Sequence, residues 1–391
     1  MYRKIESCLC CDNKNLNEIL NLNSQPLANS YLKNPDDAED VFPLAINYCD
    51  ECSHVQLTHA VDPDRLFRDY LYVSGTTKTL RDYFDWFSEF TENYVTGKNV
   101  LDIACNDGSQ LDSYKKKGYH TYGIDPAKNL YQQSSEKHSI VCDYLSEESI
   151  QKFDCNFDVI IAQNVFAHNT YPKQFLEICR EKLTDDGCIF IQTSQADMII
   201  NNQFDTIYHE HISFFSVKSF CTLAKRSGLN VIDVTRTSVH GTSFVFVLSK
   251  TKTDRSEYFI SKEVNLNFDI MNSYSNLCRQ VSQETFDAVK NLRDIGYKIV
   301  GYGAAAKGNT FLNFSEIKLD YIIDDNELKQ GLYTPGSKIL ITSIDKLNSE
   351  EEQICVVPLA WNFFDEIKQR ILTKVDKPIR FLKYFPKLEL I

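Results

Sequence analysis

Tyr208, His209, Glu210 and His211 stand together in the stretch DTIYHEHISFF, residues 205–215. The chain has only 8 histidines, so two of them here form a concentration. Three interpretations compete: a metal site, an acid–base centre, and a polar loop whose histidines are buried and satisfied. The H-E-x-x-H spacing that places two histidines on one helix face is absent, which argues against the metal. Imidazole, with an unperturbed pKa of about 6.5, suits a base at neutral pH.

The backbone conformation of this stretch decides which of its side chains can act together. In an extended segment His209 and His211 point to one side, and Tyr208 and Glu210 point to the other. The four side chains therefore cannot all face one substrate unless the segment turns.

Four cysteines form two C-x-x-C pairs, Cys8 with Cys11 and Cys49 with Cys52. Two such pairs are typical of a tetrahedral zinc site with four thiolates, which closes a segment too small to build its own core. Cys10 could replace Cys11, and the alternative is a loop of reduced cysteines. The polar stretch NSQPLANSYLKN between the pairs is typical of an insert between two zinc knuckles. A structural zinc needs no open coordination position, so we expect this metal to do no chemistry.

The central part of the chain alternates strand-like and helix-like stretches about 25–30 residues apart, which predicts a parallel, doubly wound sheet. Ligands of such sheets bind at the carboxyl ends of the strands. The residues expected around that crevice are Asp102, Cys105, Asn106, Asp107, Gly108, Asp125, Pro126, Asp143 and Gln163.

The ligand of this crevice is predicted from its acids. Asp125 ends the second strand, where a carboxylate suits a ribose diol, whereas Asp102 and Asp107 would repel a pyrophosphate. S-adenosylmethionine (SAM), with a ribose and a cationic centre, fits better, and the pattern resembles the class I methyltransferases. Ala104 stands where that family usually has a glycine, so Gly108 alone remains of the glycine-rich turn. The alternative is a Rossmann-like sheet with no part in binding.

A second α/β pattern follows, in which YKIVGYGAAAKGNTFLNF is a strand, a glycine turn and a helix. Gly301, Gly303 and Ala306 match G-x-G-x-x-A, and Asp324 follows at about the expected 20 residues. Backbone N–H groups at such a helix N-terminus bind phosphate, and Lys307 adds a donor. The pyrophosphate of a dinucleotide or of a nucleotide-sugar would satisfy this turn equally.

Composition limits the class of protein. A chain of 391 residues with 43% hydrophobic and 25% charged residues fits two to three globular domains. A formal charge of −12 argues against nucleic acid and anionic lipid as partners. No apolar run approaches the ~20 residues of a membrane span. The 13 cysteines and the N-terminus without an apolar signal core favour a reduced, cytoplasmic protein.

Over residues 5–385 the chain resembles the sugar C-methyltransferases of deoxysugar pathways, which act at C3 of a dTDP-4-keto-deoxysugar. The motifs that carry the resemblance are the two C-x-x-C pairs, LDIACNDGS, NVFAHN, YHEHISFFS, GYGAAAKGNT, IDDNELKQGLYTPGSKI and LAWNF. The resemblance implies a zinc-binding domain over residues 1–70, a Rossmann-like SAM-binding core over 71–250 and a second α/β domain over 251–391 that binds the nucleotide-sugar. It also implies a small-molecule substrate and, we expect, a monomer.

The resemblance further implies roles for single residues. His211 would be the base that removes the C3 proton, with His168 as the alternative base. Tyr208 would donate to the enolate oxygen, and Glu210 would orient an imidazole or a sugar hydroxyl, which requires a turn and leaves His209 structural. The stretch YVSGTT would add Tyr72 to the reacting centre. The residues expected on the nucleotide-sugar are Tyr302, Gly303, Lys307, Asn309, Thr310, Asp325, Asn326, Lys329 and Tyr333.

Two other functions compete with the methyltransferase. An NAD-dependent nucleotide-sugar oxidoreductase would use the C-terminal glycine turn, but the chain lacks the Tyr-x-x-x-Lys pair of sugar short-chain reductases near either sheet. A zinc-ribbon binding module without catalysis would leave the acids at the strand ends and the histidine-rich stretch unexplained.

Overall fold

The chain forms two compact units, each assembled from three separate stretches of sequence. The computed structural model describes residues 1–67, 74–76, 78–193, 197–237 and 242–391. Unit 1 comprises Met1–Asn17, Asn47–Ala196 and Ile212–Leu266, and unit 2 comprises Glu18–Ile46, Asp197–His211 and Asn267–Ile391. The units group residues by contact and not by position in the sequence, so the domain boundaries expected at residues 70 and 250 stay a prediction.

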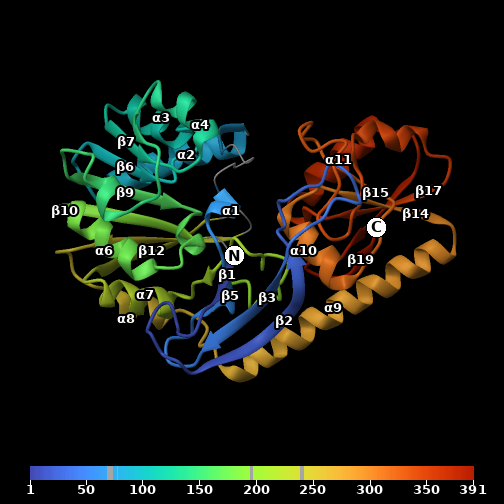
Figure 1. Ribbon diagram of the computed structural model, residues 1–391, viewed down its shortest axis with the longest axis horizontal. Coiled ribbons are helices and arrows are strands. Elements are labelled where there is room, and N and C mark those ends of the chain that lie inside the picture. Colours follow the sequence, from blue (N-terminus) through green and yellow to red (C-terminus); the bar gives the residue numbers. More distant parts are fainter. Residues whose placement is uncertain (68–73, 77, 194–196, 238–241) are drawn as a thin grey trace. The chain divides into compact units, whose positions relative to one another are not determined.

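Unit 1 is built on a sheet whose strand order, among the described residues, is β12-β13-β10-β9-β6-β7-β8 (Figure 1). Strands β10, β9, β6, β7 and β8 are parallel, and β13 is antiparallel to both of its neighbours. The expected Rossmann-like core is confirmed. The strands are β6 (Asn99–Ile103), β7 (His120–Ile124), β8 (Ser139–Val141), β9 (Phe157–Gln163), β10 (Leu183–Thr193), β12 (Asn230–Thr237) and β13 (Ser243–Ser249).

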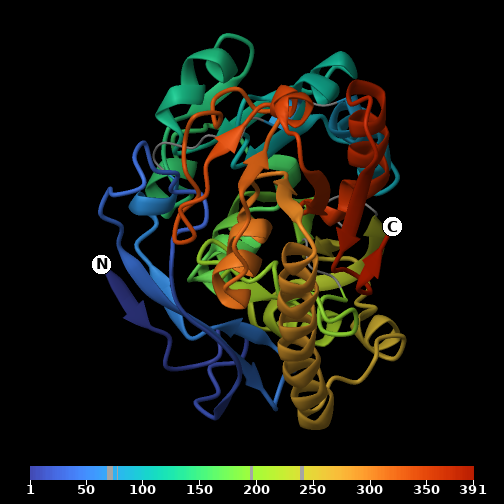
Figure 2. The ribbon, with the colours of Figure 1, turned by 90° about the vertical axis from the view of Figure 1, so that its right-hand side faces the viewer.

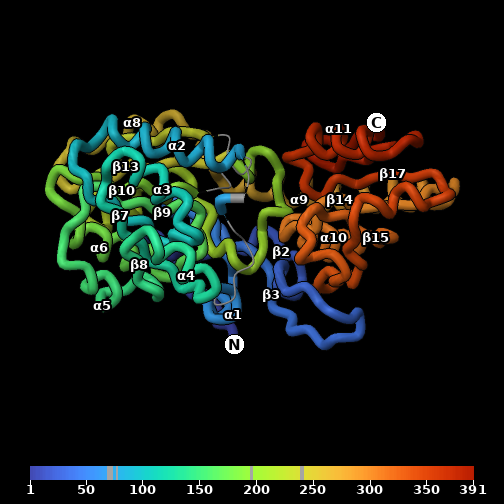
Figure 3. Tube along the Cα trace, turned by 90° about the horizontal axis from the view of Figure 1, so that it is seen from above, coloured from blue at the N-terminus to red at the C-terminus, as the bar shows by residue number. Residues whose placement is uncertain are grey.

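Helices cover both faces of this sheet, because successive strand residues point to opposite faces. Val100 of β6 packs in one core with α2 and α3, while Leu101 and Ile103 pack in another with α5, α6 and α7. The two sets of helices can be followed in Figure 3. They are α2 (Lys78–Glu92), α3 (Ser109–Lys116), α5 (Glu147–Ile150), α6 (Pro172–Lys182) and α7 (Val217–Arg226).

Short elements complete unit 1. Strand β1 pairs with β5, and β4 pairs with β11, in both cases antiparallel. These elements are β1 (Tyr2–Lys4), β4 (Val55–Leu57), β5 (His59–Val61), α1 (Asp64–Phe67), η1 (Ser74–Thr76), α4 (Lys128–Ser135), η2 (Phe166–His168), β11 (Ser213–Phe214) and α8 (Ser256–Ile260).

Unit 2 contains the second sheet, whose order in the described chain is β16-β15-β14-β17-β18-β19, parallel except for β19. The long helix α9 (Phe268–Asp294), golden in Figure 2, packs against β14. Met271, Tyr274 and Cys278 begin its buried stripe, at the three- and four-residue spacing of a helix face. The other elements are β14 (Tyr297–Tyr302), α10 (Ala306–Ser315), β15 (Tyr321–Ile323), β16 (Ile341–Thr342), η3 (Ile344–Ser349), β17 (Gln353–Pro358), η4 (Trp361–Phe363), α11 (Phe364–Lys374), β18 (Ile379–Lys383) and β19 (Glu389–Leu390).

The polar insert between the two cysteine pairs, residues 23–34, begins in the last four residues of β2 (Leu16–Pro26) and continues into the loop before β3 (Val41–Cys49). Most of β2 and β3, and all of the insert, belong to unit 2. Within the described ranges, none of the helices combines the length and the hydropathy that crossing a lipid bilayer requires.

Candidate functional site

A cavity of about 550 Å³ lies in unit 1 at the carboxyl ends of β6, β7 and β9. This volume is in the range of small-molecule sites. The predicted cofactor residues that line it are Asp102, Cys105, Asn106, Asp125, Pro126, Asp143 and Gln163, and the predicted catalytic His168 lines it too. Asp107 and Gly108 are not among its lining residues.

The turn after β6 is shaped by two residues in the left-handed region, Ala104 with a φ of 63° and Asn106 with a φ of 52°. The Asn106 N–H donates to one oxygen of Asp125 at 2.8 Å, and the Ala127 N–H donates to the other at 2.8 Å. These bonds fix the Asp125 carboxylate at the cavity wall, and each oxygen keeps a second lone pair for a ligand. Burial raises the pKa of Asp125, while the two N–H donors oppose that rise.

Asp102 and Asp107 have different surroundings. Asp102 is 4% exposed, and burial, with Asp125 and Asp107 nearby, raises its pKa well above the ordinary value. Asp107 accepts hydrogen bonds from the N–H groups of Gly75 at 3.0 Å and Ser109 at 3.1 Å, so it holds neighbouring backbone. Gly108 has a φ of 80°, and a Cβ there would lie 2.9 Å from the His138 ring. Both residues shape the turn from behind the cavity wall.

Several aromatic side chains also line the cavity. Tyr83, Phe84 and Tyr144 line the cavity, although the sequence did not single them out. An aromatic side chain on an amphipathic helix such as α2 indicates a residue of the hydrophobic core as readily as a ligand contact. His168 stacks on Phe67, with ring centroids 5.4 Å apart and an interplanar angle of 4°. Burial lowers the pKa of His168 to about 4.

The histidine-rich stretch forms the turn that the predicted roles require. Its residues 205–211 belong to unit 2, where the His211 N–H donates to the Tyr208 carbonyl at 2.9 Å. His211 Nδ1 lies 2.8 Å from the Thr206 carbonyl, and Nε2 lies 2.9 Å from the Tyr208 hydroxyl. A carbonyl only accepts, so Nδ1 carries the proton and Nε2 is the basic nitrogen that accepts from Tyr208.

The other two polar residues of the turn have separate partners. Glu210 is 5% exposed and accepts a hydrogen bond from Asn29 Nδ2 at 2.6 Å. His209 Nε2 donates to the Phe42 carbonyl at 3.2 Å, and burial lowers the pKa of His209 to about 4. This places His209 apart from the Tyr208–His211 pair. Tyr72 lies outside the described residues.

The glycine turn between β14 and α10 has the geometry of an anion site. Gly303 has a φ of 90°, and a Cβ there would lie 2.9 Å from the Ala360 Cβ. Helix α10 begins at Ala306 after Ala305, which provides no side-chain cap. The first N–H groups of α10 are therefore not satisfied by a cap, which is the usual arrangement at a phosphate-binding helix.

The charged residues around this turn mix donors with acids. Lys329 Nζ donates to the Ala304 carbonyl at 2.7 Å and lies 3.7 Å from an Asp324 oxygen. Lys307 Nζ lies 5.3 Å from the centre of the Trp361 ring. Lys307 is therefore held beside the helix N-terminus by a cation–π contact.

The remaining predicted substrate residues lie on nearby parts of unit 2. The Tyr302 hydroxyl is 3.1 Å from both Asp325 oxygens, and Arg370 is 3.0 Å from Asp325. Asn309 and Thr310 lie buried in α10, the Asn326 N–H bonds to Asp324, and the Tyr333 backbone pairs with Leu32.

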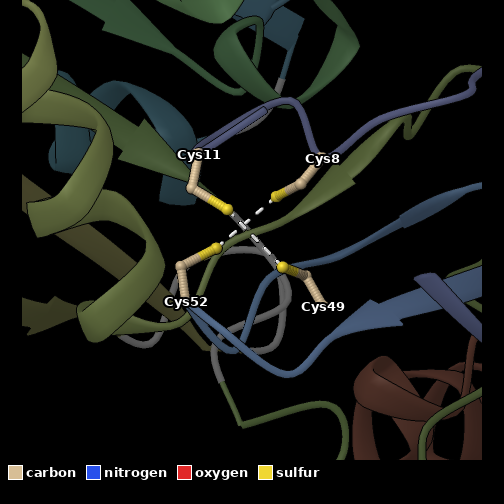
Figure 4. Close-up of side chains that lie close together, drawn as sticks. All are labelled: Cys8, Cys11, Cys49 and Cys52. Carbon is tan, nitrogen blue, oxygen red and sulfur yellow. Dashed lines mark hydrogen bonds between the residues drawn. The ribbon is translucent and has the colours of Figure 1, made fainter. Parts of the chain in front are cut away.

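The two cysteine pairs meet as the sequence predicted (Figure 4). Sγ of Cys8 is 3.5 Å from that of Cys52, Sγ of Cys11 is 3.5 Å from that of Cys49, and all four sulfurs lie within 4.8 Å of one another. Sulfurs at the corners of a tetrahedral zinc site are about 3.8 Å apart, so the donor set fits zinc. Cys10 is not part of this cluster.

Backbone geometry explains why Cys11 and not Cys10 joins the cluster. Asp12, with a φ of 63°, donates its N–H to the Cys8 carbonyl at 2.9 Å. Ser53, with a φ of 59°, donates to the Cys49 carbonyl at 2.9 Å. The two knuckles therefore have the same turn, and each places its second cysteine just before the left-handed residue.

Three family models match successive parts of the chain. A zinc binding domain matches residues 8–67, a methyltransferase domain matches residues 76–234, and a C-methyltransferase C-terminal domain matches residues 238–386. The cluster of four cysteines lies within the first match, and the cavity residues at the strand ends lie within the second.

Similar proteins include C- and O-methyltransferases. The C-methyltransferase NovU of Streptomyces niveus is 27% identical over 408 residues, which cover 99% of this chain and 97% of NovU. A ubiquinone biosynthesis O-methyltransferase of Glaesserella parasuis is 30% identical over 123 residues, 28% of this chain and 52% of that protein. The solved structure of a SAM-dependent methyltransferase from Clostridium acetobutylicum covers 45% of this chain and 94% of its own, with 11% identity and a TM-score of 0.36.

Proposed function

The chain belongs to the sugar C-methyltransferase family and is a SAM-dependent C-methyltransferase with a structural zinc site, and from this premise we propose that it methylates C3 of a dTDP-linked 4-keto-deoxysugar. The observation that carries the proposal is the Tyr208–His211 pair, in which Nε2 of His211 is held as a basic nitrogen. No finding favours the oxidoreductase alternative.

Unit 1 would hold the cofactor. In this proposal Asp125 accepts from the ribose hydroxyls, and the other strand-end residues of the cavity surround the rest of the molecule. Asp125 and the exposed Asp143 also make the cavity acidic, which favours a cationic ligand over a pyrophosphate. Bound SAM supplies an electrophilic methyl group on a sulfonium, so the zinc has no chemical step to perform.

Unit 2 would supply the base. A 4-keto group acidifies the C3 proton of the sugar, and His211 accepts that proton at Nε2 while the C3–H electron pair becomes an enolate. The carbonyl of Thr206 keeps the other ring proton on Nδ1 and stabilises the imidazolium that forms. Bound SAM would supply the methyl group that the enolate carbon receives, and its sulfur would keep the electrons of the broken bond.

Tyr208 and Glu210 would act beside the base. The Tyr208 hydroxyl bonds to Nε2, so it must turn toward the substrate before the proton moves, and from there it can donate to the enolate oxygen. Glu210 would hold a sugar hydroxyl or the imidazolium. His168 is the alternative base, but burial lowers its pKa to about 4, which makes it a weaker proton acceptor than an ordinary imidazole.

The nucleotide-sugar would be held by the glycine turn of unit 2. The uncapped N-terminus of α10, with Lys307 and Lys329 beside it, suits a diphosphate. Tyr302, Asn309, Thr310, Asp325, Asn326 and Tyr333 are proposed to contact the sugar or the nucleotide.

Two measurements test this function. First, dTDP-, GDP- and CDP-linked 4-keto-deoxysugars are incubated with SAM, and mass spectrometry should show the gain of one methyl group, most readily with dTDP. Second, exchange of the C3 hydrogen in deuterated water without SAM should be lost in His211→Asn. Exchange at the wild-type rate in His211→Asn, with loss in His168→Asn, would move the base to His168.

A further inference from the structure

The polar insert between the two cysteine pairs is fixed onto unit 2 by hydrogen bonds of its residues 27–33. Nδ2 of the buried Asn309 donates to the Ala28 carbonyl at 2.6 Å. The Tyr31 hydroxyl donates to the Ala304 carbonyl, in the glycine turn, at 2.5 Å. Both partners belong to the region proposed to bind the nucleotide-sugar.

A third attachment lies three residues beyond Asn29. The Leu32 N–H donates to the Tyr333 carbonyl at 2.9 Å, and the Tyr333 N–H donates back at 2.8 Å. Leu27 and Leu32 are 8% and 9% exposed, so apolar side chains are buried on both sides of Asn29. This segment is therefore held at a defined place and is more than a spacer between zinc knuckles.

Asn29 is the residue of this segment that reaches the histidine-rich turn. Its Nδ2 donates to Glu210 Oε1 at 2.6 Å, a short bond to a carboxylate that is 5% exposed. A buried carboxylate stays ionised only with donors around it, and hydrogen bonds to ionised groups are among the strong ones. Glu210 sits one residue from His211 and two from Tyr208.

Resting on the proposed function, we propose that Asn29 is a positioning residue of the reaction, which fixes the orientation and the ionised state of Glu210. With its Oε1 held by Asn29, Glu210 presents a defined carboxylate to a sugar hydroxyl or to the imidazolium of His211. The insert between the cysteine pairs is thereby a working part of the substrate site.

The simpler possibility is that Asn29 only satisfies a buried carboxylate for the sake of stability. The structural role and the positioning role of Asn29 predict different effects of the Asn29→Ala substitution. A purely structural bond affects the free energy of unfolding and leaves the pH dependence of turnover alone. A positioning bond also moves the acid limb of the pH profile, because a carboxylate that loses a donor binds its proton more tightly.

The test compares Asn29→Ala and Asn29→Asp with Asn21→Ala in the full chain. Asn21 is a matched control, because its Nδ2 donates to Glu18 Oε1 at 3.3 Å on the exposed surface. For Asn29→Ala we expect kcat for the nucleotide-sugar to fall about tenfold, with the acid limb of kcat about one pH unit higher and the KM for SAM unchanged. Asn29→Asp should show a larger shift, and Asn21→Ala should match the wild type.

A second measurement needs no substrate and separates this inference from the function on which it rests. A double-mutant cycle of Asn29→Ala and Glu210→Gln, read as the free energy of unfolding in urea, should show the two residues coupled at pH 7. Additive effects would overturn the inference. Coupling with an unshifted acid limb would reduce Asn29 to a structural role and also overturn it. A wild type that methylates none of the nucleotide-sugars refutes the proposed function itself, and the positioning role with it.

Discussion

The Asp125 carboxylate both holds backbone and lines the cavity. It accepts one backbone N–H on each oxygen and still lines the cavity. The sequence predicted its place at the end of the second strand, because strand ends of a parallel sheet gather at one edge. The N–H bond from Asn106 could not be predicted, since it depends on the turn at residues 104–106.

Asp125→Ala is expected to weaken SAM binding. Loss of a hydrogen bond to a charged group costs about 1.5–3 kcal/mol, so the dissociation constant should rise on the order of tenfold to a hundredfold. Isothermal calorimetry measures it. The control is Asp143→Ala, which removes an acid of the same charge from an exposed part of the cavity. This variant should lose less affinity for SAM than Asp125→Ala. Equal losses of affinity in the two variants would mean that Asp125 acts through the net charge of the cavity and not through a contact with the ribose.

The residues at the histidine-rich turn divide between what the sequence could and could not predict. The need for a turn followed from side-chain alternation, and the hydrogen bond from His211 to Tyr208 supplies it. The sequence could not predict the hydrogen-bond partner of Glu210, because Asn29 precedes Glu210 by 181 residues. No periodicity or spacing links positions so far apart.

At the scale of elements, the glycine turn between β14 and α10 offers a test with a built-in control. Gly303 and Gly296 have nearly the same φ, 90° and 91°, but only Gly303 faces a neighbour, Ala360 at 2.9 Å from an added Cβ. Both substitutions to alanine strain the backbone, by about 1 kcal/mol.

Gly303→Ala should therefore destabilise the protein more than Gly296→Ala, and it should also weaken binding of the nucleotide-sugar. Urea unfolding gives the first quantity, and titration with dTDP-sugar gives the second. If the two variants unfold alike and bind alike, the turn has no tight packing to lose and its part in binding is refuted.

The zinc knuckles are a second element whose residues can be tested one by one. Wild-type protein purified without added zinc should contain about one equivalent of the metal. Cys49→Ser and Cys11→Ser should lose it, because each removes one of four ligands, whereas Cys10→Ser should keep it. Zinc retained in Cys11→Ser and lost in Cys10→Ser would contradict the geometry of the first knuckle. Emission spectrometry of the purified variants decides between them.

Elements were predicted more completely than single contacts. Strand β6, which contains Asp102, and strand β7, which ends just before Asp125, follow from apolar periodicity and turn residues. Ala104 was noted as a departure from the usual glycine, and its φ of 63° shows that the turn keeps a glycine-like conformation. Tyr83 and Phe84 of the cavity could not be predicted as ligand contacts, because α2 has the apolar pattern of any helix that packs on a sheet.

At the scale of the whole molecule, buried histidines make stability depend on pH. Burial lowers the pKa of His168 and of His209 from 6.5 to about 4. The unfolded chain therefore binds protons as the pH falls through 6.5, while the folded protein does not until about pH 4. The free energy of unfolding should fall across this window as the pH drops.

His209→Gln should flatten that dependence, because it removes one of the contributing groups while an amide can still donate to the Phe42 carbonyl. Urea unfolding at several pH values between 4 and 6.5 measures the slope. His120→Gln, at an exposed position, is the control and should keep the wild-type slope. An equal slope in all three proteins would mean that His209 titrates normally in the folded state.

The assembly of each unit from three stretches of chain has a consequence for protein synthesis. Unit 1 has all of its residues once Leu266 has been made, whereas residues 18–46 of unit 2 must wait for residues 267–391. At ~5–20 residues per second that delay is tens of seconds on the ribosome. During it Ala28, Tyr31 and Leu32 lack their hydrogen-bond partners in the C-terminal stretch, and a nascent chain in that condition is a natural client for a chaperone.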